Sequence, residues 1–153
     1  MGERSPINDT DASGMFIGLR PDTERENIYL AVLEGVAFAI RDNLEIAKKL
    51  GIKIKKSFLC GGGAKSKLWC RILANVLNIE IELPKSEEGP GYGVAMLAMV
   101  AQKEYESIKE CCDALIGVRG KISPEERLVC LYEEKYNKYK KIYPAVKSLY
   151  KEI

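Results

Sequence analysis

A glycine-rich run in the middle of the chain contains the residues whose types and spacing could do chemistry. From Phe58 to Trp69 it reads F-L-C-G-G-G-A-K-S-K-L-W, so an apolar strand ends in three glycines and a helix begins near Ser66. Glycine lacks a Cβ and lets a phosphate or a sugar approach the backbone, while the N–H groups of a helix N-terminus attract an anion. The run indicates a nucleotide site, and a tight turn without a ligand is the alternative.

This run matches neither common phosphate-binding signature. The Walker A pattern G-x-x-x-x-G-K-[ST] does not fit it, and no G-x-G-x-x-G follows the strand. Ser66 is expected to cap the following helix rather than to contact a ligand. Trp69 is expected to be buried rather than to stack on a base, because apolar residues flank it on the same helix.

The composition of the chain excludes several classes of function. There are 24 basic and 22 acidic residues, so the net charge of +2 provides no strong field for nucleic acid or an acidic membrane. No apolar run reaches the roughly 18 residues of a membrane span, and no signal-peptide pattern opens the chain. The five cysteines are odd in number and lack C-x-x-C spacing, which favours reduced thiols and a cytoplasmic location.

The sequence contains no histidine, which limits both metal binding and catalysis. Without histidine or ligand-like cysteine spacing, we expect no metal site. A Ser-His-Asp or Cys-His arrangement cannot be built, and the acidic residues stand mostly on helix faces that should be solvated or at helix caps. No catalytic residue is therefore assigned.

Hydrophobic spacing predicts alternating helices and strands after a loop-like stretch of about twenty residues. Asp22 is expected to cap a long helix over 22–50, within which Gly35 should allow close helix packing. The elements that follow are expected to be a strand at 57–60, a helix at 66–77, a strand at 79–83 and a helix at 91–104. This order predicts an α/β fold with a short parallel sheet.

The last third of the chain is expected to be helical. Capping boxes at Ser107 and Ser123 should open two further helices. A stripe at helical spacing, more typical of a core than of a ligand site, is formed by Tyr132, Tyr136, Tyr139 and Tyr143. Pro144 is expected to kink or end the last helix.

Five segments, in this order along the chain, resemble the C-terminal lobe of the FGGY carbohydrate kinases, and the xylulose kinases among them in particular. They are G-E-R-S-P with G-M-F-I-G-L (Gly2 to Leu19), L-E-G-V-A-F-A-I-R-D (Leu33 to Asp42), the glycine-rich run, the stretch from Asn75 to Leu97 with its G-P-G-Y-G, and the tyrosine-rich segment Tyr132 to Ala145. The resemblance extends from about Gly2 to Pro144.

The resemblance implies part of a ribonuclease H-like, actin-like ATPase lobe that is rich in helix. One domain is expected over 1–153, with a loop at 1–21, a nucleotide-binding βα core at 22–104 and C-terminal helices at 105–153. In the family these motifs stand in the last third of a longer chain. The sequence is therefore expected to be a fragment, with Met1 as an artificial start.

The same resemblance implies that this segment binds ATP or ADP. Gly62 and Gly63 match the glycine pair that lies against the α-phosphate and the ribose, and Ala64 and Lys67 complete the expected contacts. Lys67 stands where several relatives carry an asparagine that reaches the adenosine end. Mg²⁺, the sugar and the aspartate base are expected to belong mainly to the missing upstream lobe.

The function implied is that of the ATP-binding C-terminal part of a kinase that transfers the γ-phosphoryl group to D-xylulose, the fragment itself being inactive. A kinase for glycerol, gluconate or ribulose, and a non-catalytic helical interaction domain, are the alternatives. Asn75 replaces the family's usual carboxylate and Arg71 its glutamine, which leaves purine and sugar specificity open. A homodimer is expected, because partner strands would be missing from the sheet edge.

Overall fold

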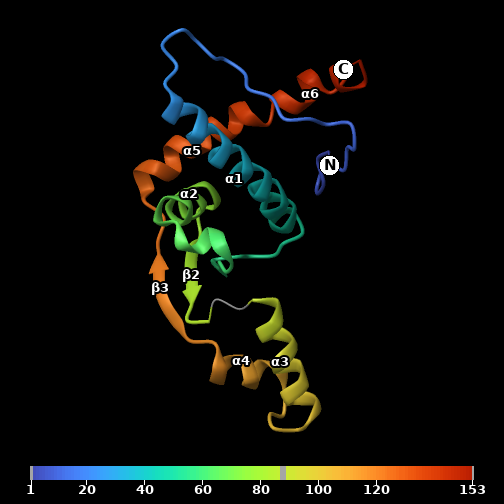
Figure 1. Cartoon of the computed structure of the whole chain (residues 1–153), viewed down its shortest axis with the longest axis vertical. Helices are drawn as coiled ribbons and strands as arrows, with labels where there is room; N and C mark the ends of the chain where they lie inside the picture. Colours follow the sequence, from blue (N-terminus) through green and yellow to red (C-terminus); the bar gives the residue numbers. More distant parts are fainter. Residues whose placement is uncertain (1, 87–88, 153) are drawn as a thin grey trace. The chain divides into compact units, whose positions relative to one another are not determined.

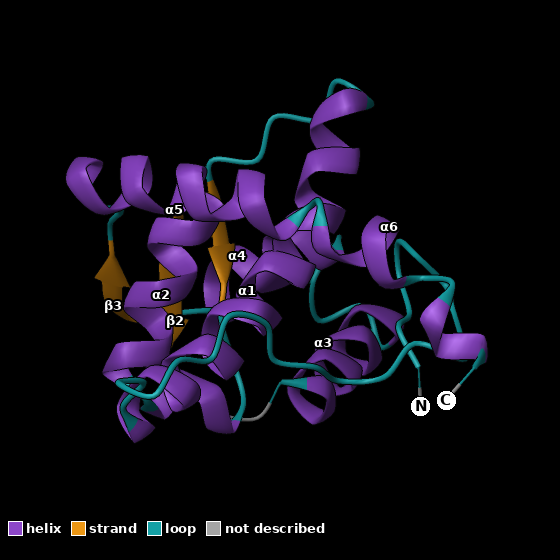
Figure 2. Cartoon of the chain, turned by 90° about the horizontal axis from the view of Figure 1, so that it is seen from above, coloured by secondary structure: helices purple, strands orange, loops and turns teal. Residues whose placement is uncertain are grey.

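The longest element of the structure is the helix α1 (Arg25–Lys49), which belongs to the first of two units. The computed structural model describes residues 2–86 and 89–152. Unit 1 combines Met1–Ile54, Asn75–Asn78 and Glu125–Ile153, and unit 2 combines Lys55–Ala74 with Ile79–Pro124. Helices predominate over strands in the chain, as the colours of Figure 2 show.

Unit 1 is organised around α1 and the helix α5 (Glu126–Tyr139), which lies beside it (Figure 1). The helix α6 (Ile142–Val146) and the short 3-10 helix η2 (Leu149–Lys151) follow. Phe38 on α1 packs against a group of α5 rings at centroid distances of 5.2 to 6.2 Å: Tyr132, Tyr136 and Tyr139. These rings form a core, as the stripe predicts.

Polar pairs on both sides of this aromatic core fix α1 against α5. The buried carboxylate of Glu34 accepts hydrogen bonds from the Lys135 ammonium at 2.8 and 2.9 Å. The Tyr136 hydroxyl donates to the Asp42 carboxylate at 2.5 Å. Buried polar groups are costly without such partners, so these pairs define one register between the two helices.

Unit 2 contains a three-stranded sheet in the order β1-β2-β3: β1 (Lys56–Phe58), β2 (Glu80–Pro84) and β3 (Val118–Ile122). β1 and β2 pair in parallel, with Ser57 opposite Ile81, as the sequence predicts. β3 pairs with β2 in antiparallel fashion, and it was not predicted. The sheet is therefore mixed. The glycine in V-R-G-K-I weakens the sequence signal of β3, whose residues alternate between partly buried and exposed.

The helices of unit 2 follow the predicted positions closely. The 3-10 helix η1 (Gly62–Lys65) precedes α2 (Lys67–Leu77), which continues into unit 1, and α3 (Pro90–Ala101) contacts α4 (Ile108–Leu115). The predicted cap at Ser107 is confirmed, since its Oγ accepts a hydrogen bond from the Glu110 N–H at 3.2 Å.

Two predicted helix starts are wrong. α1 begins at Arg25 rather than after Asp22, because Thr23 Oγ1 accepts the Arg20 N–H at 2.8 Å and holds a turn in front of the helix. α5 begins at Glu126, without a capping side chain of its own, while the Ser123 hydroxyl donates to the Glu80 carboxylate at 3.4 Å. Local side-chain hydrogen bonds compete with helix caps, which explains both shifts.

Two further predictions concern Pro144 and Gly35. α5 ends at Tyr139, before Pro144, which instead lies in the first turn of α6, where its missing N–H costs little. The close packing predicted at Gly35 is not made, since no described atom beyond its own helix backbone and chain neighbours lies within 4 Å of a Cβ built there.

An open hollow of about 1200 Å³ lies in unit 1, lined by the N-terminal stretch, α1, α5 and α6. Its lining is mostly apolar and includes Val32 and Val36 of α1, which are 49% and 50% exposed. Exposed apolar side chains gathered in this way form a candidate interaction surface.

Candidate functional site

The glycine-rich run forms a tight turn at the carboxyl end of β1. Gly61 has φ 80° and ψ −172°, a combination that only glycine adopts readily. The Ala64 N–H donates to the Gly61 carbonyl at 3.1 Å, and the Ser66 N–H donates to the Gly63 carbonyl at 3.1 Å. The conformation of the turn is therefore set by its own backbone.

The first turn of α2 follows directly and is capped as predicted. Ser66 Oγ accepts a hydrogen bond from the Trp69 N–H at 3.2 Å, and the Ser66 carbonyl accepts one from the Cys70 N–H at 3.0 Å. Within the described residues, the N–H groups of Lys67 and Leu68 have no such acceptor. These donors and the positive end of the helix dipole can take an anion.

Burial makes the cysteine next to this turn an unreactive group. Cys70 lies behind η1, and its thiol approaches the Ala64 carbonyl at 3.6 Å. Burial raises the pKa of the Cys70 thiol, so the thiolate that a nucleophile needs is disfavoured. Cys70 therefore supports the turn and is not a nucleophile.

The structure brings the four sequence-predicted residues together, but not in equal roles. Gly62, Gly63 and Ala64 are consecutive in η1, and Lys67 is the first residue of α2. Gly62, Gly63 and Lys67 are exposed, whereas Ala64 is only 7% exposed and its N–H is held by Gly61. Ala64 therefore supports the turn from inside and presents neither its side chain nor its N–H to a ligand.

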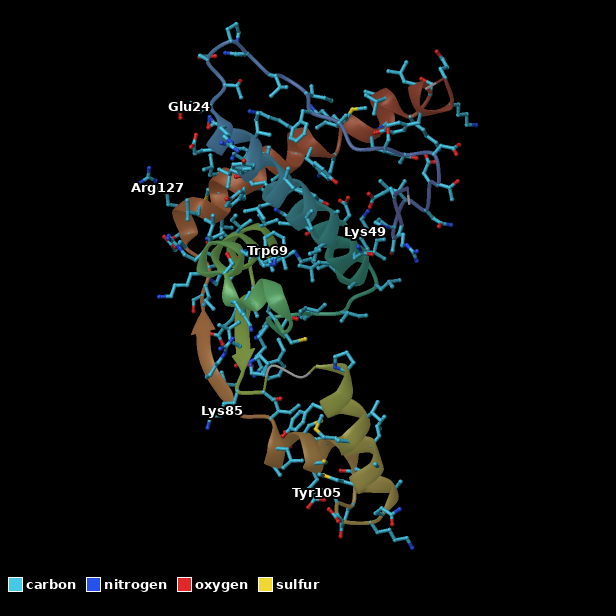
Figure 3. The ribbon with its side chains drawn as sticks, viewed as in Figure 1. Glu24, Lys49, Trp69, Lys85, Tyr105 and Arg127 are labelled. Atoms are coloured by element: carbon cyan, nitrogen blue, oxygen red, sulfur yellow. The ribbon has the colours of Figure 1, made fainter. Side chains whose placement is uncertain are left out.

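The two glycines of the predicted pair differ in what stands beside them. No described atom lies within 4 Å of a Cβ built at Gly62, so that side of the turn is open. A Cβ built at Gly63 would lie 3.0 Å from both Cδ1 and Nε1 of Trp69, the partly buried indole labelled on α2 in Figure 3. Gly62 leaves space for a ligand, and Gly63 leaves space for the indole.

A second glycine-rich turn lies against the first, which sequence reasoning missed. A Cβ built at Gly89, which precedes α3, would lie 3.0 Å from Cys60 Sγ at the end of β1. The signal was present in G-P-G-Y-G after the second strand, because carboxyl ends of adjacent parallel strands meet at one edge. A cavity of about 140 Å³ at this edge is lined by Phe58, Cys60, Gly89, Tyr92, Met96 and Leu115.

One buried carboxylate ties the sheet together beneath these turns. Glu82 on β2 is 2% exposed and pairs with Lys121 on β3 at 2.8 Å and with Lys56 on β1 at 3.2 Å. The hydrogen bond from Lys121, and with it that from Lys56, lowers the pKa of the Glu82 carboxyl. A carboxylate held ionised between two ammonium groups is a poor general base, so its role is structural.

The described residues contain neither a metal-binding cluster nor a helix that could span a membrane. No group of three or more cysteine, aspartate or glutamate side chains there could hold a metal ion. No helix in residues 2–86 and 89–152 is long and apolar enough to cross a membrane.

Comparison with known proteins then decides the family. The model of the C-terminal domain of the FGGY family of carbohydrate kinases matches residues 1–102, which is most of the chain. The chain belongs to this family. The FGGY match contains α1, the glycine-rich turn, β2 and the whole of α3.

Individual FGGY relatives agree with this assignment. The xylulose kinase of Staphylococcus xylosus is 36% identical over 143 residues, which cover 94% of this chain and 30% of that protein. A solved xyloylose kinase from Brucella ovis superposes with a TM-score of 0.84 at 36% identity, over 94% of this chain and 30% of its own. A solved Plasmodium falciparum glycerol kinase with ADP gives 0.74 at 25% identity, over 90% and 28%.

These comparisons confirm the expected fold, since the structural neighbours are FGGY kinases with the actin-like ATPase fold. They also set a limit, because the chain spans about 30% of the length of the curated xylulose kinases that it matches.

Proposed function

We propose that this chain is the ATP-binding C-terminal part of a sugar kinase, and that the sugar is D-xylulose. The observation that carries the proposal is the open side of Gly62 in a rigid turn at the carboxyl end of β1, next to the N-terminus of α2. Support for the nucleotide comes from a related glycerol kinase solved with ADP, and support for the sugar comes from relatives named xylulose kinase.

The residues of the turn fit a nucleotide. The missing side chain at Gly62 allows a phosphate or ribose to reach the backbone, and the N–H groups of Lys67 and Leu68 provide donors for phosphate oxygens. The exposed ammonium of Lys67 adds a positive charge on the first turn of α2. ATP supplies the γ-phosphoryl group, and this chain binds and orients its α-phosphate and ribose.

Mg²⁺ is usually held by one or two carboxylates together with the phosphates of the substrate. The described residues contain no cluster of three or more potential metal-ligating side chains, and no Mg²⁺ ligand is assigned to them. No general base is assigned either, because Glu82, the carboxylate beneath the turns, is already paired with two lysines. Phosphoryl transfer depends on positioning and charge neutralisation from all sides, so this chain alone should not phosphorylate a sugar.

Nucleotide binding is tested directly by titrating the chain with ADP and ATP in a calorimeter. Binding with a Kd at or below the millimolar range is expected, and Gly62→Val should abolish it while the far-UV circular dichroism stays unchanged. Gly14→Val is the matched control, because a Cβ at Gly14 also meets no described atom and Gly14 lies in unit 1. Binding that survives Gly62→Val would make the run a structural turn, and no binding at all would favour the helical interaction domain.

The sugar is tested separately with a coupled assay for ADP release. D-Xylulose, ribulose, gluconate and glycerol are each supplied with ATP and Mg²⁺ to this chain and to a longer protein that contains it. We expect turnover of D-xylulose by the longer protein only. Preferred turnover of one of the other three would replace D-xylulose as the substrate, and turnover by this chain alone would disprove its proposed inactivity.

A further inference from the structure

The contact between Trp69 and Gly63 has a role that the comparison with related proteins does not assign. We infer that Trp69 is a positioning residue for the nucleotide: its indole supports the glycine-rich turn from behind and sets where the open side at Gly62 lies. This inference rests on the proposed function, because it concerns the same ligand.

The indole approaches Gly63 more closely than a larger residue would allow. A Cβ at Gly63 would lie 3.0 Å from Trp69 Cδ1 and 3.0 Å from Nε1, which is tighter than nine in ten contacts of real Cβ atoms. Gly63 does not have the positive φ that would favour glycine for backbone reasons, whereas Gly61 does. The glycine at 63 is therefore required by the tryptophan and not by its own conformation.

Trp69 is itself held by a rigid element. The backbone N–H of Trp69 donates to Ser66 Oγ at 3.2 Å, and two other residues of α2, Cys70 and Leu73, are 1% and 3% exposed. The backbone that carries the indole is therefore fixed, and the indole itself is partly buried. A methyl group at Gly63 must therefore shift the turn, the indole or both by a few tenths of an ångström.

The turn is thus closed on one side and open on the other. The indole occupies the space beside Gly63, while no described atom stands within 4 Å of a Cβ at Gly62. A nucleotide that binds at Gly62 therefore meets a turn whose next residue is already in contact with the Trp69 indole. Such preorganisation improves affinity by reducing the ordering that binding requires.

Substitutions at the two glycines should therefore weaken ADP binding for different reasons. Gly63→Ala should weaken ADP binding through the indole, and Trp69→Ala should relieve that defect by removing the clashing atoms. Gly62→Ala should weaken binding by meeting the nucleotide itself, and Trp69→Ala should not relieve it. Second-site rescue at one glycine but not at its neighbour would not arise from a general loss of stability.

The experiment measures the Kd for ADP by calorimetry for the wild-type chain, Gly62→Ala, Gly63→Ala, Trp69→Ala and the two double variants. Gly63→Ala is expected to raise the Kd about tenfold, and Gly63→Ala with Trp69→Ala should return to within about threefold of Trp69→Ala alone. Trp69→Phe replaces Trp69→Ala if the latter does not show a cooperative thermal melt. Trp69 is the single tryptophan, so its emission in the wild-type chain should shift on ADP binding.

The outcomes separate this inference from the proposal on which it rests. If the wild-type chain binds ADP but the defects at both glycines are independent of residue 69, the positioning role is overturned and nucleotide binding stands. If Trp69→Ala and Trp69→Phe both fold and leave the Kd for ADP within about twofold of wild type, the positioning role is likewise overturned. If the wild-type chain binds no ADP, the proposed function fails, and the positioning role fails with it.

Discussion

Asn75 Oδ1, near the end of α2, accepts a hydrogen bond from the backbone N–H of Glu125 at 2.7 Å, immediately before α5. Asn75 is only 2% exposed, and Glu125 makes no capping bond with its own side chain. A buried amide on one helix therefore caps another that begins fifty residues later in the sequence. Asn75 is therefore used for structure in this chain.

Replacing this amide should destabilise the chain. Asn75→Ala leaves the Glu125 N–H without its acceptor, which costs about 1–3 kcal/mol in the free energy of unfolding. Asn75→Asp keeps an acceptor oxygen near a helix N-terminus and should lose less. Urea unfolding followed by circular dichroism measures both variants. Equal stability of Asn75→Ala and the wild type would contradict the capping role.

Gly35 offers the opposite effect, a simple stabilising substitution. It lies in the interior of α1, and no described atom comes within 4 Å of a Cβ built there. Gly35→Ala should therefore raise the free energy of unfolding by about 0.5–1 kcal/mol, because alanine loses less backbone entropy in a helix. Thermal unfolding checks this value. A lower melting temperature would show that another segment or a second copy packs closely at Gly35.

The Glu82 carboxylate should make stability depend on pH. Lys121 and Lys56 lower its pKa in the folded chain, so the unfolded chain binds the proton more tightly. The stabilisation is present above the ordinary glutamate pKa of about 4.3 and is lost as the pH falls through the lower folded value. Denaturant midpoints measured from pH 7 to pH 3 test this. Glu82→Gln should flatten the acid limb, and an unchanged limb would place the acid sensitivity elsewhere.

The isolated chain should self-associate. Val32 and Val36 expose half of their surface in unit 1, and Phe58 on the short strand β1 is 47% exposed. Burying such apolar area contributes about 25 cal/mol per Å², and a two-fold symmetric dimer is the simplest way to do so. Sedimentation equilibrium at micromolar concentrations should therefore give a mass above 17.1 kDa.

Two variants identify the face that associates. Val36→Lys should weaken a dimer that forms through α1, and Phe58→Lys should weaken one that forms at β1. A monomer of 17.1 kDa with a cooperative melt would contradict self-association and would show that the chain closes its own core.

The sequence by itself determined the elements whose signals are local. Helical spacing of apolar residues predicted α1, and the alternation of strand, glycines and helix predicted β1, α2 and their parallel partner β2. Ser66 and Ser107 were recognisable as caps because a capping hydrogen bond joins residues three positions apart. The family followed from the order of such local segments.

Only the tertiary structure decided the features that join residues distant in sequence. β3 has too few apolar residues to be recognised alone, and it exists because β2 presents an edge with which it can pair. The Asn75 cap on α5 spans fifty residues and replaces the cap expected at Ser123. The meeting of Cys60 with Gly89 likewise depends on two strands lying side by side.

For the candidate site, too, the sequence predicted one part and the tertiary structure decided the other. Three consecutive glycines indicated a close backbone approach. The sequence alone does not distinguish the roles of Gly61, Gly62 and Gly63, because all three are the same residue type. The fold gives each a separate reason: a positive φ at Gly61, open space at Gly62 and the Trp69 indole beside Gly63. The sequence shows that these residues have no side chain. What a Cβ at each position would meet is decided only by the fold, when α2 packs against the turn.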